Sequence, residues 1–162
     1  MPFESQAVRG VTQHFGPRRT NGSYGGQVVT EGSIKEEVIR IRYNELPTGG
    51  SAKSPIIPAN ASVLSAQFKV KVAFTGGTSF TVGTYNASTG AAVVADGLMT
   101  AANLALANIN AVGNLVTGSG TQVNTSVGTS AVRVGMAATG TFTAGYAEIV
   151  IRYLEAPPTP TA

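Results

Sequence analysis

The sequence contains no cysteine, no tryptophan and a single histidine, His14, among its 162 residues. Without cysteine the chain has no disulfide framework, no thiolate metal site and no cysteine nucleophile. A reducing cell interior suits a chain of this kind. A length of 162 residues is enough for one domain whose hydrophobic core is stable without cross-links. We therefore expect one domain that folds by burying apolar side chains.

Charged residues are also scarce, and they are unevenly placed. Residues 1–45 hold six Lys or Arg and five Asp or Glu, whereas Asp96 is the only charged residue between Val72 and Val132. The surface of a solvated monomer normally carries roughly a quarter charged residues. The uncharged stretch therefore indicates a surface covered by another molecule, or a particle kept soluble by other means. The net charge of +3 is far below that of a dedicated nucleic-acid-binding protein.

Long hydrophobic runs are missing as well. No stretch of the sequence reaches the ~18 apolar residues of a membrane-spanning helix. The first ten residues, MPFESQAVRG, lack the apolar region of a secretory signal. We expect synthesis in the cytoplasm of the cell that expresses the protein, and no membrane partner.

Groups that carry chemistry are few. A Ser-His-Asp arrangement would need His14, in a polar segment, to reach Asp96, and nothing in the sequence supports this. Glu36 and Glu37 are neighbours on a predicted strand, so they point to opposite faces and form no carboxylate pair. Asp96-Gly97 matches one fragment of a calcium loop, but calcium needs six or more oxygens, which favours a turn or helix cap. The sequence predicts no enzyme activity, no cofactor, no metal site and no small-molecule substrate.

Period-two alternation of apolar and polar residues predicts two long strands. Residues 35–43 place Ile39, Ile41 and Tyr43 on one face and Val38, Arg40 and Arg42 on the other. Residues 62–74 place Lys69 and Lys71 on an outer, solvated face. The opposite, apolar face of this second strand is predicted to hold Leu64, Ala66, Phe68, Val70, Val72 and Phe74.

The remaining segments are shorter. Residues 75–78, TGGT, are predicted to close a hairpin, after which residues 79–85 return with Phe80 and Val82 inward. Further short strands are predicted at 114–118, 121–128, 130–139 and 145–156. Residues 44–60 contain three prolines and a glycine pair, which predicts a loop. Residues 96–110 favour a short helix at most, with Asp96 as its cap.

Short alternating strands, Gly/Thr-rich turns and no long helix predict an all-β protein. We expect an antiparallel jelly-roll-like β-sandwich of about eight strands, with an extended N-terminal arm. The expected boundaries are an arm at 1–33, the β-sandwich domain at 34–156 and a proline-rich tail at 157–162.

The stretch FGPRRTNGSYGG, residues 15–26, combines two arginines, a proline and four glycines. It lacks the Gly-Lys, the preceding strand and the following helix of a phosphate-binding loop. Two arginines release few counterions, so nucleic acid would bind weakly. A strap that binds a protein partner fits best, with Phe15, Arg18, Arg19 and Tyr24 as its anchors. A tail without a partner is the alternative.

Three segments together resemble a known family: FGPRRTNGSYGGQVVTEGSIKEEVIRIRY, IPANASVLSAQFKVKVAFTGGTSFTVGT and DGLMTAANL. They look like the head decoration (cement) proteins of tailed bacteriophages. The resemblance implies a non-enzymatic virion protein that binds the major capsid protein on the outside of the expanded head. It also implies a homotrimer that stabilises contacts between capsomers, with the arm lying over neighbouring subunits.

Two other functions remain open beside this one. A phage fibre or tail-appendage domain would recognise a host receptor, either a glycan or a protein, and it would carry exposed aromatic residues on its loops. The sequence has no Trp and only five scattered Tyr, which disfavours that function. A glycan-degrading sandwich enzyme would need clustered acids, which the middle half of the chain lacks.

Overall fold

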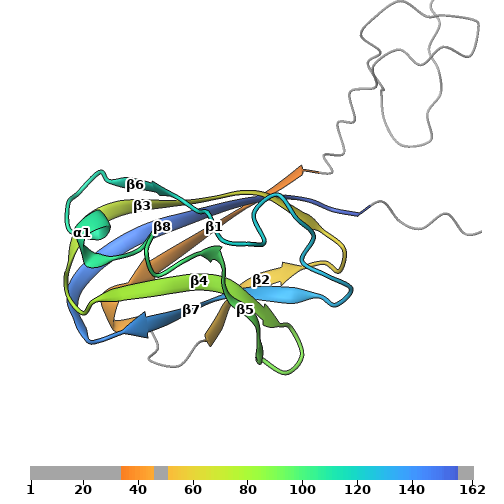
Figure 1. The fold of residues 1–162 in the computed structure, drawn as a ribbon, viewed down its shortest axis with the longest axis horizontal. Coiled ribbons are helices and arrows are strands. Elements are labelled where there is room, and N and C mark those ends of the chain that lie inside the picture. The colour runs from red at the N-terminus through yellow and green to blue at the C-terminus, as the bar shows by residue number, and fades with distance from the viewer. Residues whose placement is uncertain (1–33, 46–50, 157–162) are drawn as a thin grey trace, which may run out of the picture. The chain divides into compact units, whose positions relative to one another are not determined.

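Two antiparallel four-stranded sheets pack face to face in this computed structural model, which describes residues 34–45 and 51–156 (Figure 1). Sheet A has the order β1 (Ile34–Arg42), β8 (Phe142–Leu154), β3 (Ser62–Gly76) and β6 (Leu115–Thr117). Sheet B has the order β2 (Ser51–Ile57), β7 (Val132–Thr139), β4 (Ser79–Asn86) and β5 (Ala92–Met99). Two short helices accompany the sheets in the described residues, η1 (Tyr43–Glu45) and α1 (Leu106–Ile109).

The order of the strands is that of a jelly roll. Every connection except β4–β5 carries the chain from one sheet to the other, and the resulting strand orders are 1-8-3-6 and 2-7-4-5. This interleaving of two Greek keys defines the double-sheet jelly roll. The all-β, jelly-roll-like sandwich predicted from alternation and turn spacing is confirmed.

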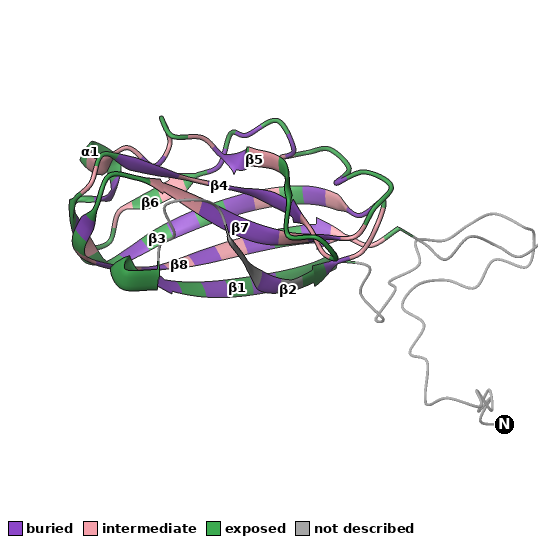
Figure 2. Cartoon of the chain, turned by 90° about the horizontal axis from the view of Figure 1, so that it is seen from below, coloured by how far each residue is buried: buried purple, intermediate pink, exposed green. Residues whose placement is uncertain are grey.

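Strand β1 shows the predicted alternation. Ile39 and Ile41 are buried, and the residues between them are exposed, as the alternating colours of β1 in Figure 2 show. Glu36 and Glu37 lie on opposite faces, as predicted, with Glu36 exposed and Glu37 buried. Tyr43 was predicted on the inner face, but it begins η1 and is exposed, because the strand ends at Arg42. The strands predicted at 114–118, 130–139 and 145–156 are present as β6, β7 and β8.

Strand β3 departs from strict alternation because its pairing with β8 shifts register at four places, the first two of which are bulges on β3. The ladder steps past Leu64 and again past Lys71, so each is an extra residue on the β3 side. Leu64 and Val72, predicted to be inward, are therefore 38% and 49% exposed, and Val63 is buried in place of Leu64. The other predicted inward residues are buried: Ala66, Phe68, Val70 and Phe74.

Four phenylalanine rings form the centre of the core. Phe68, Phe74, Phe80 and Phe142 come from β3, β4 and β8, and their ring centroids lie 5.2 to 6.0 Å apart. Gly145 has φ of 137°, and a Cβ there would overlap the ring of Phe74. Glycine at this position therefore lets β8 pass directly over the aromatic cluster.

The prediction that residues 75–78 close a hairpin is wrong, because the two strands that they connect do not pair with each other. β3 lies in sheet A and β4 in sheet B, so this turn crosses between the sheets. Gly76 and Gly77 both have positive φ, 71° and 62°, which explains the glycine pair. A tight glycine turn has the same local signal whether it closes a ladder or crosses a sandwich. Phe80 and Val82 are buried, as predicted.

The loop predicted at residues 44–60 contains a strand, β2. Pro55 lies within the irregular step of the β2–β7 ladder, between Ala52 and Ile56. Because β2 pairs only with β7, it is an edge strand, where a residue without an N–H group is tolerated.

Two further predictions are wrong in part. Residues 96–99 belong to β5, so Asp96 caps no helix; α1 is a single turn that begins after Ala105. Residues 121–128 form turns and one isolated bridge, between Ser126 and Ser62, rather than a strand. In both segments, uncharged Ala, Asn, Thr and Val give a weak local preference that tertiary packing overrides.

Candidate interaction surface

The residues predicted to bind a partner lie outside the described part of the chain. Phe15, Arg18, Arg19 and Tyr24 all fall in residues 1–33, as does His14. Their role as anchors stays a prediction. The surfaces of the described sandwich therefore supply the structural observations on function.

Residues 34–45 and 51–156 contain no group of side chains that could hold a metal ion. None of the groups there brings together three or more His, Cys, Asp or Glu side chains. A shallow hollow of about 380 Å³ lies beside α1, and its lining carries no titratable side chain. The lining residues are Ala107, Asn108, Asn114, Leu115, Val116 and Thr117. No helix in this part of the chain has the length and apolar character needed to cross a bilayer.

The outer face of sheet A has charged and apolar rows that run across the strands. Residues directly opposite one another in a ladder lie on the same face, so the register defines each row. The first and third rows are charged: Glu36, Arg152 and Ser65; then Arg40, Glu148, Lys69 and Leu115. The second and fourth rows are largely apolar: Val38, Val150, Gln67 and Thr117; then Arg42, Tyr146 and Val72.

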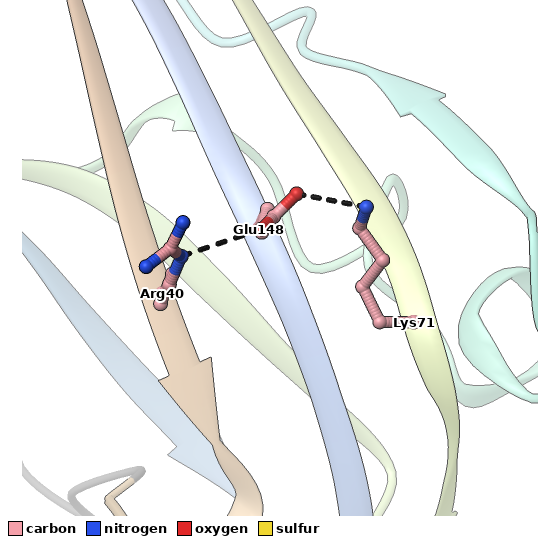
Figure 3. A network of polar contacts seen from close by, with 3 residues as sticks. All are labelled: Arg40, Lys71 and Glu148. Carbon is pink, nitrogen blue, oxygen red and sulfur yellow. Dashed lines mark hydrogen bonds and ion pairs between the residues drawn. The ribbon is translucent and has the colours of Figure 1, made fainter.

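Glu148 is the centre of an ion-pair network on this face. Figure 3 shows its carboxylate on β8 between Arg40 of β1 and Lys71 of β3. Its Oε1 lies 3.4 Å from Arg40 Nε, and its Oε2 lies 2.9 Å from Lys71 Nζ. The hydrogen bond from Lys71, supported by Arg40, lowers the pKa of Glu148 below its ordinary value. Lys71 is exposed on the same face as Lys69, and the second bulge of β3 turns Val72 outward beside it.

Cations outnumber acids on this face. Its five cations are Arg40, Arg42, Lys69, Lys71 and Arg152, and its two acids are Glu36 and Glu148. Arg152 Nε lies 2.6 Å from Glu36 Oε2, so each acid is already engaged. Arg42 and Lys69 form no ion pair with another described residue. The strand residues of this face therefore present a surplus of three positive charges; beside them, Glu45 Oε2 of η1 accepts a hydrogen bond from the Arg42 backbone N–H at 3.0 Å.

Exposed apolar side chains separate the charged rows. Val38 is 50% exposed and Val72 is 49% exposed, and Val150 and Tyr146 lie beside them half-buried. Alternating apolar and charged rows can contact a protein surface that offers both apolar and acidic side chains.

The outer face of sheet B is built differently. Gly83 lies opposite Gly135, and a Cβ at Gly83 would overlap the backbone of Val94 and Ala95, where β5 arches over β4. Arg133 is the one described charged side chain among the outward residues of β4 and β7. Its Nη1 donates a hydrogen bond to the Ser54 carbonyl at 2.8 Å, so its charge is partly satisfied within the sheet.

A single carboxyl group lies inside the sandwich. Glu37 is 8% exposed, and neither of its oxygens has a hydrogen-bond partner of good geometry among the described residues. Burial raises the pKa of Glu37, although the nearby Ser54 hydroxyl partly stabilises the charged form. Burial also raises the pKa of Tyr153, and the negative charge of Glu37 is the second cause of that rise.

Sequence reasoning found part of the outer face of sheet A. Alternation placed Arg40, Arg42, Lys69 and Lys71 on polar faces of two predicted strands. It did not indicate that β8 lies between these strands or that Glu148 joins them, because the register between distant segments is invisible in local patterns. The available signal was an acidic residue on the polar face of a third predicted strand.

Comparison with known proteins gives similarity at the level of the fold. One chain of the cyanophage Pam1 capsid asymmetric unit is similar with a TM-score of 0.57 and 12% identity, over 86% of this chain and 98% of that chain. A chain in the capsid of Ralstonia phage GP4 has a TM-score of 0.54 and 16% identity, over 77% of this chain and 86% of that chain. A chain of the acid-stable capsid of Helicobacter pylori bacteriophage KHP30 has a TM-score of 0.51 and 16% identity, over 75% and 87%. No family model and no curated protein matches the sequence.

Proposed function

We propose that this protein is a non-enzymatic structural protein of a bacteriophage virion, a decoration protein that binds the outside of the expanded head. The observation that carries the proposal is the shared fold with chains from three phage capsid structures. The likeness covers between 86% and 98% of each of those chains, so each is, over nearly its whole length, a sandwich of this kind. The fold similarity supports a place in the head rather than on a fibre.

The surfaces of the sandwich support the same function. In a decoration protein, one surface meets the shell and another meets neighbouring copies. The outer face of sheet B suits contact between copies, because Arg133 is the one described charge among the outward residues of β4 and β7 and few charges would be buried there. We infer a homotrimer joined through this face, with the major capsid protein as the external partner.

Weak contacts are sufficient for such a protein. Each copy that binds a lattice at several points is retained by effective concentration, even when each single contact is weak. In the proposed arrangement, residues 1–33 are a second contact, with Phe15, Arg18, Arg19 and Tyr24 as its anchors. Contacts across the joints between capsomers would then resist the pressure of packaged DNA.

The test uses expanded heads assembled without this protein. Purified full-length protein is added in increasing amounts, and the bound fraction is measured after sedimentation of the heads. Saturable binding with a fixed number of copies per head is expected, together with slower disruption of the heads on heating. Absence of retention on the heads would reject the proposal, and binding to host cells instead would favour a fibre or tail-appendage protein.

A second experiment tests the arm. The variant with Phe15, Arg18, Arg19 and Tyr24 all replaced by Ala should remain folded by circular dichroism and bind heads at least tenfold more weakly, since such anchors typically contribute more than about 1 kcal/mol each. Replacement of Ser5, Gln6, Thr12 and Gln13 by Ala is the matched control in the same segment. Equal binding by both variants would show that these four anchors are not the contact residues.

A further inference from the structure

The cationic outer face of sheet A has no complement within the protein itself. Residues 1–33 contain three Arg and two Glu, so their net charge is positive and does not complement it. A second copy docked through the same face would bring two surpluses of three positive charges together, which is repulsive. The described outer face of sheet B is nearly uncharged and offers no acidic patch.

Nucleic acid also fits this face poorly. Glu148 lies in the centre of the face, and Glu36 occupies its first row, so phosphates would meet carboxylates at both positions. The apolar rows around Val38 and Val72 gain nothing from contact with a phosphate backbone. A protein surface with carboxylates that match the cations and apolar side chains that cover the valines satisfies both kinds of row.

We propose that the outer face of sheet A is the docking surface for an acidic protein surface, with Arg42 and Lys69 as its free cations. Within the proposed function, on which the identity of the partner rests, that surface belongs to the shell of the head. Arg40 and Lys71 are held in place by Glu148, and Arg152 by Glu36. The pairs within the face thus orient three cations and leave two to meet the partner.

The dimensions of the face explain why one contact alone is weak. Six residue steps along the strands span ~20 Å, and four strands span ~14 Å. This footprint of ~300 Å² is well below the ~800 Å² per partner of a standard interface. Retention therefore depends on repetition over a lattice, and the charges contribute mainly to encounter rate and to orientation.

The test compares two double variants that change the net charge equally. Arg42→Gln/Lys69→Gln removes the free cations of the face. Ser88→Glu/Ala91→Glu adds two acids at exposed positions of the turn between β4 and β5, which belong to the other sheet. We expect the first variant to bind heads about tenfold more weakly than the control in low salt, with the difference lost at about 0.5 M salt. Arg42→Lys/Lys69→Arg keeps both charges and should bind as the wild type does.

A poly-glutamate column tests the face without heads. The wild type should elute at higher salt than Arg42→Gln/Lys69→Gln, and the control should elute after that variant despite its equal net charge. Equal elution of the two charge-matched variants would overturn the inference, as would duplex DNA that displaces the protein from heads. If the three proteins elute from the column in the expected order but the wild type does not bind heads, the proposed function is rejected and the inference about the face is kept.

Discussion

The outer faces of the two sheets belong to one jelly roll, yet they are built on different physical principles. On sheet A, long charged side chains and half-exposed valines project from β1, β8 and β3, with Glu148 joining Arg40 and Lys71. On sheet B, Gly83 and Gly135 remove side chains altogether, and the backbone of β5 packs over the strand. The first face is suited to electrostatic recognition, and the second to close packing against a neutral surface.

The difference reflects where charge occurs along the chain. Sheet A takes its three long strands from the charged ends of the sequence and from the start of the uncharged stretch. Sheet B takes β4 and β5 from within that stretch. Because a jelly roll interleaves its strands between two sheets, it separates two compositions that follow one another along the chain into two opposite surfaces.

The largest expected effect concerns self-association through sheet B. Ala137→Glu places a charge on the outer face of sheet B, opposite Thr81. An unpaired charge buried between copies costs about 3–5 kcal/mol, so the homotrimer should dissociate. Light scattering measures the mass, with Thr117→Glu on the edge strand of sheet A as a control of equal charge. A trimer that persists in Ala137→Glu would place the interface elsewhere.

The next effect concerns the closed packing of sheet B. Gly83→Val puts a side chain where the backbone of Val94 and Ala95 lies, so the arch of β5 must move. We expect a loss of about 3 kcal/mol in the free energy of unfolding, at the upper end for overpacking. Gln67→Val, on the exposed outer face of sheet A, should change the same quantity by less than about 0.5 kcal/mol. Urea unfolding measures both, and similar losses would remove the distinction between the faces.

A smaller effect on stability is expected from the buried face of sheet A, where Glu37 lies. Glu37→Gln removes a buried carboxylate and should stabilise the fold at pH 7 by about 1 kcal/mol. The pKa of Glu37 in the folded state lies above its ordinary 4.5, so the wild type gains stability as the pH falls through that raised value. The advantage of Glu37→Gln should therefore shrink on acidification and be lost below pH 4.5.

Urea unfolding between pH 7 and pH 4 follows this difference. Glu36→Gln is the matched control, because Glu36 is the exposed neighbour of Glu37 on the same strand. A wild type more stable than Glu37→Gln at pH 7 would show that the charged form has a compensating partner.

The smallest effect concerns the exposed network. The lowered pKa of Glu148 means that its ion pairs stabilise the folded state above its unfolded pKa and are lost as the pH falls through the folded value. Glu148→Gln should lower the melting temperature slightly at neutral pH and low salt, with no difference at acid pH or at about 1 M salt. Calorimetry measures the difference, and a loss that persists in high salt would indicate packing rather than charge.

Much of the fold could be predicted because alternation is a local property. Each of β1, β7 and β8 was found from its own residues, and the buried Ile149 and Ile151 follow directly from a period of two. In β2, prolines and glycines hid a strand that only its edge position permits. In residues 96–110, the local preference for a helix was weaker than the demands of packing.

The candidate surface could be predicted only in part. The outward cations of β1 and β3 were visible, but Arg40 and Glu148 are 108 residues apart in sequence, and only the ladder brings them together. The same holds for the exposure of Leu64 and Val72, which depends on where β8 skips a residue of β3.

The sequence by itself determined the all-β class, the positions of most strands and the uncharged middle of the chain, because these depend on composition and on a two-residue period. Only the tertiary structure decided which sheet each strand joins, where the bulges fall and which charges meet. The physical reason is that strand pairing is set by contacts between distant segments, whose combined burial and hydrogen bonding outweigh the preference of any one of them.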